Sequence, residues 1–184
     1  MIVFTAPSGA GKTTIVRHLL DKYRDSLSFS ISATTRERRE REEDGKDYYF
    51  LDEEEFRVLI EEDGLIEWEE VYPGKFYGTL RTEVQRILES GKKLVFDIDV
   101  YGAQNLKNKY GNRCLTVFVK PPSFGILVQR LRARNTESEE SFEKRINKVK
   151  KEMLFEHSFD HVLLNDTLEE TLKKAEALIE NYMI

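Results

Sequence analysis

Five short apolar runs recur along the chain, and most are separated by enough residues for a helix. Each run is rich in β-branched or aromatic side chains, which is typical of strands buried on both faces of a parallel sheet. They span residues 2–5, 27–32, 93–99, 114–119 and 161–165. Apolar residues at helical spacing predict helices at residues 12–24, 79–90, 123–134, 139–157 and 167–182. The alternation predicts an α/β fold, with a core of five parallel strands and helices on both faces.

One stretch breaks this alternation, because its aromatic residues alternate with polar ones as in short strands exposed on one face. The runs fall at residues 46–51, 65–72 and 75–79. A Pro-Gly pair at residues 73–74 supplies a turn, and Asp52 with Glu55 predicts the start of a short helix. We therefore expect a small mixed sheet, inserted into the parallel core at residues 33 to about 85.

Composition narrows the function classes. The chain has 184 residues, with 29 Lys and Arg against 34 Asp and Glu, and a net charge of −5. This length fits one domain, and the negative charge argues against general binding to nucleic acid. One cysteine, Cys114, excludes an internal disulfide, and three scattered histidines lack metal-ligand spacing. No membrane span or signal segment is predicted, so we expect a cytoplasmic protein, a monomer or small homo-oligomer.

The segment APSGAGKT at residues 6–13 lies between the first predicted strand and the first predicted helix. Its glycines let backbone N–H groups turn toward one point at a helix N-terminus, which suits a polyphosphate. We expect Lys12 to reach the β- and γ-phosphates of ATP, and the Thr13 hydroxyl to bind Mg²⁺. The predicted nucleotide-binding residues of this loop are Ala6, Pro7, Ser8, Gly9, Ala10, Gly11, Lys12, Thr13 and Thr14.

Ala6 departs from the strict phosphate-loop pattern, which has glycine at this position. An alanine is harmless there if its φ is negative, and costs roughly 1 kcal/mol or more if φ is positive. The alternative for the whole segment is a glycine-rich turn with an exposed lysine. The strand before it and the helix after it favour the phosphate loop.

Eight blocks of this sequence resemble guanylate kinases in order and spacing. They are APSGAGKT, FSISATTRERR (29–39), GKDYYF (45–50), LIEW (65–68), YGT (77–79), LVFDIDVYG (94–102), KPPS (120–123) and LLND (163–166). The resemblance covers essentially the whole chain. It implies a P-loop nucleoside monophosphate kinase that transfers the γ-phosphoryl group of MgATP to GMP, and to dGMP, in purine nucleotide metabolism.

The resemblance also implies a single domain over residues 1–184 with three parts. These are a core of residues 1–32, 86–121 and 146–184, a GMP-binding insertion at residues 33–85, and a helical lid at residues 122–145.

The phosphate of the acceptor is expected to meet two arginines. Arg36 and Arg39 can each present a fork to phosphate oxygens, and the Tyr48 and Tyr77 hydroxyls can add hydrogen bonds. The alternative is that residues 36–42 form a solvated charge run. We favour that alternative only for the other two arginines of the run, Arg38 and Arg41.

Guanine offers two adjacent donors beside a carbonyl acceptor, and a single carboxylate can accept both donors. By the family pattern Glu67 would be this carboxylate, with the Ser32 and Thr79 hydroxyls donating to the carbonyl. The alternative is that Glu67 is one more surface acid beside Glu69 and Glu70.

Two acids close an apolar strand at residues 94–99. Asp97 resembles the acid that organises Mg²⁺ in P-loop kinases, and Asp99 could contact the acceptor nucleoside. A structural Asp that caps the following helix is the alternative for Asp99.

Three arginines are expected to neutralise charge on the transferring phosphoryl group together with Lys12 and Arg36: Arg130, Arg134 and Arg145. Asn135 stands where the family commonly has glycine. Asn165 would touch the adenine of ATP by resemblance, and its alternative is a helix-capping role.

Three other functions remain to be weighed. A guanylate-kinase-like scaffold domain without activity usually lacks a working phosphate loop, whereas Lys12, Thr13 and Asp97 are present here. A P-loop GTPase needs an N-K-x-D element, and Asn108-Lys109 is followed by Tyr-Gly. A nucleotide kinase with a different acceptor would be distinguished by Glu67.

Overall fold

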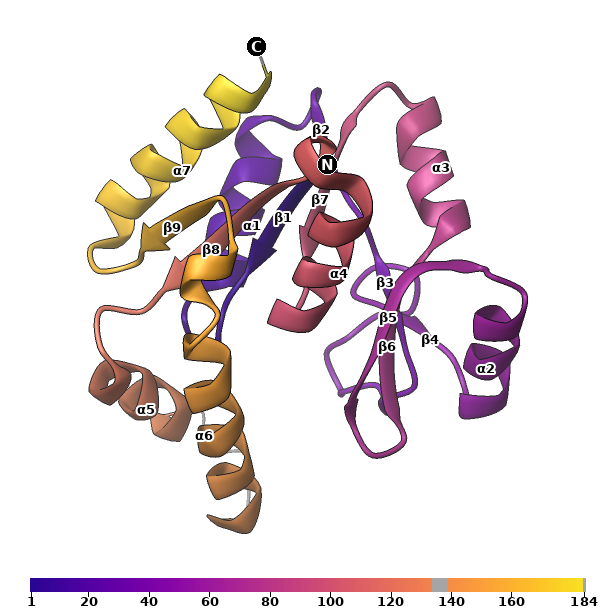
Figure 1. The fold of residues 1–184 in the computed structure, drawn as a ribbon, viewed down its shortest axis with the longest axis horizontal. Coiled ribbons are helices and arrows are strands. Elements are labelled where there is room, and N and C mark those ends of the chain that lie inside the picture. Colours follow the sequence, from indigo (N-terminus) through magenta and orange to yellow (C-terminus); the bar gives the residue numbers. More distant parts are fainter. Residues whose placement is uncertain (134–138, 184) are drawn as a thin grey trace.

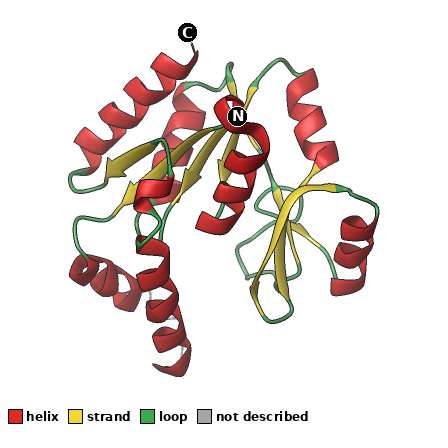
Figure 2. Ribbon diagram, viewed as in Figure 1, coloured by secondary structure: helices red, strands yellow, loops and turns green. Residues whose placement is uncertain are grey.

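The computed structural model describes residues 1–133 and 139–183, which form two sheets and the helices around them (Figures 1 and 2). The larger sheet has the order β2-β7-β1-β8-β9, and every neighbouring pair is parallel. Its strands are β1 (Ile2–Thr5), β2 (Leu27–Phe29), β7 (Lys93–Asp97), β8 (Leu115–Lys120) and β9 (His161–Leu164). The predicted five-stranded parallel core is confirmed.

Helices cover both faces of this sheet because the strand side chains alternate between two apolar clusters. Ile2 and Phe4 of β1 join the cluster of the α1 and α7 side, whereas Val3 joins the cluster of the α3 and α4 side. The helices are α1 (Lys12–Lys22), α3 (Arg81–Glu89), α4 (Val100–Tyr110), α5 (Phe124–Ala133), α6 (Glu139–Met153) and α7 (Leu168–Met183). Short 3₁₀ turns lie at Gly111–Arg113 and Glu156–Ser158. Within the described ranges, no helix is long and apolar enough to cross a membrane.

The second sheet stands to one side of the core in Figure 1, with the order β4-β3-β6-β5. Its strands are β3 (Ser32–Thr34), β4 (Tyr49–Phe50), β5 (Leu65–Tyr72) and β6 (Lys75–Leu80), and helix α2 (Glu53–Glu61) packs on it. The β3–β4 pair is parallel and the others are antiparallel, so the sheet is mixed, as predicted. The predicted helix start is also present, because Asp52 and Glu55 form a reciprocal capping box.

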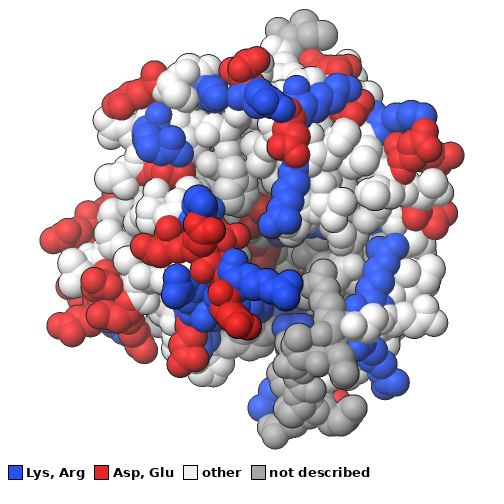
Figure 3. Space-filling view, turned by 180° about the vertical axis from the view of Figure 1, so that it is seen from behind, with Lys and Arg blue, Asp and Glu red and all other residues white. Residues whose placement is uncertain are grey.

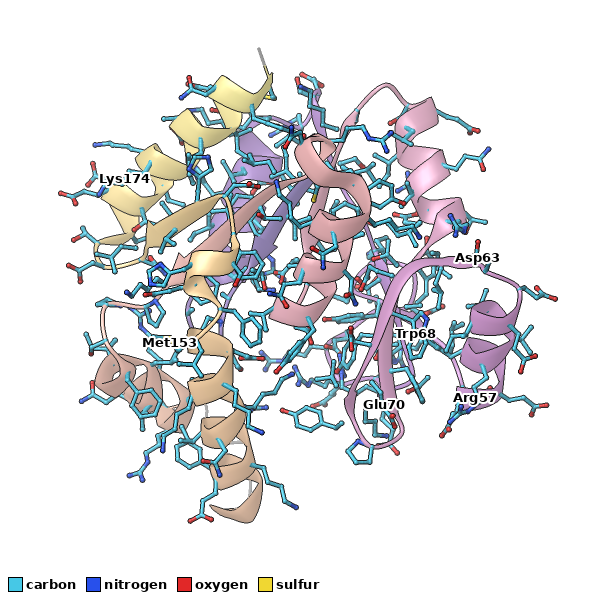
Figure 4. The ribbon with its side chains drawn as sticks, viewed as in Figure 1. Arg57, Asp63, Trp68, Glu70, Met153 and Lys174 are labelled. Carbon is cyan, nitrogen blue, oxygen red and sulfur yellow. The ribbon has the colours of Figure 1, made fainter. Side chains whose placement is uncertain are left out.

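The two faces of this second sheet have different partners. Phe76 and Gly78 of β6 face α2, where Phe76 stacks on Phe56 and contacts Trp68. Figure 4 shows Trp68 on the hairpin beside helix α2, which carries Arg57. Tyr77 and Thr79 alternate with these residues and face the opposite way. That opposite face is free to line a cavity.

The predicted strand at residues 27–32 is wrong in one respect, because it is two strands in two sheets. Ser30 N–H still bonds Val95 O of the core at 2.9 Å, but Ser32 already pairs with Thr79 of β6. The strand-like pattern runs through both segments without a break, so it cannot reveal this change.

Glu83 in the first turn of α3 ties the insertion to the core. Its carboxylate accepts hydrogen bonds from Ile31 N–H, where the chain enters the insertion, and from the Tyr49 hydroxyl of β4. Arg86 forks onto the same two oxygens at 2.8 and 2.9 Å. The two crossings between the sheets are therefore fixed around one buried carboxylate.

Candidate nucleotide-binding site

A cavity of about 510 Å³ opens where the carboxyl ends of the core strands meet the second sheet and helix α6. This volume falls in the range of small-molecule sites. The phosphate loop contributes residues 6–14, and α6 contributes Arg145, Lys148 and Glu152. From the second sheet and the loops beside it come Ser32, Arg36, Arg39, Tyr48, Glu67, Glu69, Tyr72 and Tyr77. Most of the predicted site residues thus line one space.

The phosphate loop adopts the backbone that its glycines predict. Gly9 and Gly11 have φ of 88° and 92°, in the left-handed region. Asp63 is the non-glycine residue with positive φ in the described chain, so Ala6 has none. The alanine that replaces the expected glycine is therefore unstrained, and it is buried in the core cluster.

Asn165 is hydrogen-bonded to the backbone of the phosphate loop. Its side-chain amide donates to Ala10 O at 2.7 Å, and its backbone N–H donates to Lys120 O. A Cβ on Gly11 would lie 2.3 Å from the same amide nitrogen. This residue therefore positions the loop, and its contact with an adenine stays a prediction.

Lys12 and Thr13 at the start of α1 converge on Asp97 at the end of β7. The Lys12 ammonium pairs with Asp97 Oδ1 and also donates to Ile98 O, while the Thr13 hydroxyl donates to Oδ2 at 3.0 Å. Parallel strands place such groups at their carboxyl ends, next to the following helix. Thr13 and Asp97, which were both assigned to Mg²⁺ from the sequence, are therefore neighbours, and the pairing of Lys12 with Asp97 was not predicted.

The predicted base-recognition residues are neighbours in the second sheet. Ser32 lies opposite Thr79 in the β3–β6 pair, and Thr79 lies opposite Glu67 in the β6–β5 pair. All three side chains are nearly buried, and the Thr79 hydroxyl donates to Glu67 Oε1 at 2.6 Å. The sheet register, rather than any local motif, places Thr79 between Ser32 and Glu67 in one row across three strands, and Ser32 and Glu67 line the cavity.

Burial raises the pKa of Glu67 to about 7, against the opposing effect of the Thr79 hydrogen bond. The nearby charges of Asp99 and Glu69 add to the increase. Glu67 is not the surface acid of the alternative interpretation, because only 8% of it is exposed. Space for the carboxylate depends on Gly102, where a Cβ would lie 2.7 Å from Glu67 Oε2.

Arg36 is held by a carboxylate that the sequence analysis overlooked. Both of its terminal nitrogens bond Glu42 at 2.8 Å, and its guanidinium lies over the Tyr48 ring, 5.2 Å from the centroid. The Arg36 hydrogen bond lowers the pKa of Glu42. Glu42 lies six residues after Arg36 within the charge run, so the signal was present but could not be separated from its acidic neighbours.

Arg39 and the two tyrosines complete this side of the cavity. Arg39 is largely exposed and 3.9 Å from Glu42, so it can turn toward a ligand. Tyr48 packs edge-on against Tyr77 at 6.0 Å, and burial raises the pKa of Tyr48 to about 12. Its hydroxyl therefore stays protonated and can donate. Arg38 and Arg41 are exposed, as expected for surface residues.

Asp99 caps helix α4, as the alternative interpretation proposed. Its Oδ1 accepts from Tyr101 N–H and Gly102 N–H at 3.1 and 2.9 Å. Oδ2 is buried without a hydrogen-bond donor, and the residue also lines the cavity. The capping interpretation therefore holds for Oδ1, and contact of Oδ2 with the acceptor nucleoside stays a prediction.

The predicted lid arginines fall into three groups. Arg145 of α6 lines the cavity, whereas Arg130 lies on α5 outside the lining residues. Arg134 and the Asn135 departure lie outside the described residues. The cavity is lined by cationic side chains although the net charge of the chain is −5; they include Lys12, Arg36, Arg39 and Arg145. Figure 3 shows basic and acidic residues interspersed over the surface.

A phosphate loop after the first strand of a parallel sheet, with an acid at the end of the neighbouring strand, defines a P-loop kinase fold. The chain belongs to the guanylate kinase family, because the family model described as guanylate kinase matches residues 1–182.

Individual relatives agree with this family. A guanylate kinase of Porphyromonas gingivalis is 48% identical over 168 residues, which are 91% of this chain and 89% of that protein. A guanylate kinase of Chlorobium chlorochromatii is 44% identical and covers 100% of this chain and 95% of its own. The crystal structure of guanylate kinase from Anaplasma phagocytophilum superposes with a TM-score of 0.76 at 27% identity, over 99% of this chain and 85% of that one.

Proposed function

We propose that this protein transfers the γ-phosphoryl group of MgATP to GMP, and to dGMP, giving ADP and GDP or dGDP. The observation that carries the proposal is the row formed by Ser32, Thr79 and Glu67, whose outer members Ser32 and Glu67 line the same cavity as the phosphate loop. Membership of the guanylate kinase family supports the same reaction. The site therefore has an end for a nucleobase and an end for a polyphosphate.

The base is selected by hydrogen-bond pattern. The Oε2 atom of Glu67 can accept from the guanine ring N–H and the exocyclic amine, while the Ser32 hydroxyl can donate to the carbonyl. The Thr79 hydroxyl already donates its proton to Glu67 Oε1, so its part is to orient the carboxylate. Adenine presents an acceptor where guanine presents the ring donor, so it would leave the buried carboxylate without that bond. None of these contacts needs a 2′-hydroxyl, which is the reason dGMP is included.

The acceptor phosphate would replace Glu42 on Arg36. Arg36 already presents two parallel N–H bonds to a carboxylate, which is the geometry that a phosphate also accepts. The Tyr48 and Tyr77 hydroxyls face the same space. Exchange of a carboxylate for a dianionic phosphate keeps the guanidinium paired.

The residues near Asp97 fit a magnesium ion. Hydroxyl and carboxylate oxygens are the ligands that Mg²⁺ prefers, and it usually binds few protein ligands beside waters and phosphates. Thr13 and Asp97 already lie 3.0 Å apart, and no cluster of three or more potential metal-ligating side chains is present among the described residues. When bound, the ion supplies positive charge to the β- and γ-phosphates.

Transfer then depends on placement. An oxygen of the acceptor phosphate attacks the γ-phosphorus in line, the bond to the β–γ bridging oxygen breaks, and ADP leaves. No covalent intermediate on the protein is needed. Lys12, Arg36 and Arg145 would stabilise the charge that spreads over the transferring oxygens.

A coupled assay that measures ADP formation tests the proposal. MgATP is presented with GMP, dGMP, AMP, UMP or CMP, and turnover is expected with the first two. Turnover with AMP at a comparable kcat/KM would contradict the assignment of Glu67. Binding of GMP without any turnover would instead favour the scaffold-domain alternative.

A further inference from the structure

Asp99 uses only one of its two carboxylate oxygens in the fold. Oδ1 caps helix α4, whereas Oδ2 is buried and has no hydrogen-bond donor. A buried carboxylate oxygen without a donor is unfavourable unless a charge lies near it. The carboxylate of Glu67 is close by, since a Cβ on Gly102 would contact Glu67 and lie within 3.6 Å of Asp99. Two carboxylates therefore share one end of the cavity.

Lys148 is the cation that faces this pair. Its ammonium lies 3.8 Å from Asp99 Oδ2, and only 22% of its side chain is exposed. It also lies over the ring of Tyr72, 5.1 Å from the centroid. Because Lys148 follows Arg145 by three residues on α6, both project from the same face of this helix into the cavity.

A second carboxylate holds Lys148 from the other side. Glu152 Oε1 lies 3.4 Å from the Lys148 ammonium, one helical turn further along α6. Glu152 is 3% exposed, and it lines the cavity together with the phosphate loop. The ammonium thus lies between this buried carboxylate and the free oxygen of Asp99.

We propose, on the basis of the function proposed above, that Lys148 is a positioning residue of the acceptor site. It holds the free oxygen of Asp99 in place beside Glu67, so that both carboxylates can accept from donors of the acceptor nucleoside. It contacts neither the ATP phosphates nor the reacting atoms. Loss of the ammonium leaves Asp99, Glu67 and Glu152 to repel one another, and the acceptor loses a fixed hydrogen-bond partner.

Neutral variants at position 148 give the first test. In Lys148→Met and Lys148→Gln we expect the KM for GMP and its dissociation constant, measured by calorimetry, to rise about five- to tenfold. The KM for MgATP should change less than twofold, and Lys148→Arg should recover most of the GMP affinity. Lys151→Met is the matched control, because Lys151 is an exposed residue of the same helix. Thermal unfolding of each variant checks that it folds.

A double-mutant cycle tests the route of the effect. If Lys148 acts through Asp99, Lys148→Met should change GMP affinity less than twofold in an Asp99→Asn background, which retains Oδ1 for the helix cap. Additive effects, or equal losses for GMP and MgATP, would overturn the proposal. GMP affinity unchanged in both neutral variants would overturn it as well.

The same measurements distinguish a failure of the proposed function from a failure of the role proposed for Lys148. If the unsubstituted protein does not bind GMP, the proposed function fails and this inference fails with it. If it binds and phosphorylates GMP while the neutral Lys148 variants behave like the control, only the role of Lys148 is wrong.

Discussion

The hydroxyl of Thr79 donates to Glu67 Oε1 at 2.6 Å across two antiparallel strands, which leaves Oε2 as the oxygen available to a ligand. One hydrogen bond thus fixes the orientation of a buried carboxylate. Because the pair belongs to a sheet rather than a loop, its geometry is set before any ligand arrives.

Substitution of Glu67 by Gln should raise the KM for GMP without changing the KM for MgATP. The amide retains the shape but loses the charge and one acceptor, so we expect the KM for GMP to rise about 100-fold. The KM for MgATP should stay within twofold, because the phosphate loop is untouched. Glu70→Gln is the control, since Glu70 bonds Gly74 N–H in the hairpin turn. Steady-state kinetics with each substrate varied would show equal GMP constants if the assignment were wrong.

Acidification should weaken GMP binding through the same residue. The pKa of Glu67 is raised to about 7 by burial, so the carboxylate is mostly protonated below that pH and ionised above it. A protonated carboxyl cannot accept both guanine donors. We therefore expect GMP affinity to fall by up to about tenfold per pH unit below pH 7.

Calorimetry between pH 5.5 and 8 measures this dependence. The phosphate of GMP also titrates in this range, so the informative quantity is the difference between the unsubstituted protein and Glu67→Gln. The same pH profile in both proteins would show that Glu67 is not the titrating group.

Replacement of Lys12 by Met should stop transfer while the fold persists. The ammonium bridges the phosphate loop to Asp97 and Ile98, and its charge is the part that would act on the γ-phosphoryl group. We expect kcat to fall about 1000-fold or more. Lys22→Met, at the other end of α1 in a surface pair with Glu176, should retain activity. Circular dichroism verifies folding, and a kcat within tenfold of normal would contradict the role.

Alanine substitutions at two glycines with similar φ angles test how closely the phosphate loop packs against Asn165. Gly11 and Gly91 have φ of 92° and 74°, but a Cβ on Gly11 meets Asn165 whereas a Cβ on Gly91 meets nothing within 4 Å. Gly91→Ala should therefore cost about 1 kcal/mol of unfolding free energy, from backbone strain alone. Gly11→Ala should cost more, about 3 kcal/mol, and should also abolish MgATP binding. Equal losses in both variants would show that the contact with Asn165 is unimportant.

The sequence predicts what local patterns can encode. The core strands, the phosphate loop with Lys12 and the Asp52 capping box depend on residues a few positions apart, and the structure contains all of them. The expected burial on both faces is wrong for the edge strand β9, which is largely exposed. The family resemblance placed Ser32 and Thr79 beside Glu67, but hydrophobic pattern alone could not, since they meet only through strand register. The pattern also gave no reason to divide residues 27–32 between two sheets.

Side-chain partnerships over long separations were the least predictable part of the site. Glu42 on Arg36 and Lys148 beside Asp99 are ion pairs whose members are ordinary charged residues in sequence. Many alternative pairs were equally plausible, because 34% of the residues are charged. Asn165, 155 residues after the Ala10 carbonyl that it bonds, could likewise be placed only by the fold.

The change of sheet between Phe29 and Ser32 has a consequence for evolution and engineering. The chain leaves the core at Ile31 and returns to it at Arg81, where helix α3 begins. Glu83 of α3 accepts a hydrogen bond from Ile31 N–H, so the two ends of the insertion are linked. Ser32, Glu67 and Thr79, which we propose for base recognition, lie between the two crossings, whereas the phosphate loop lies before the first. If this assignment holds, substitutions within one continuous stretch of the chain could alter the preferred nucleobase while the phosphate loop stays unchanged.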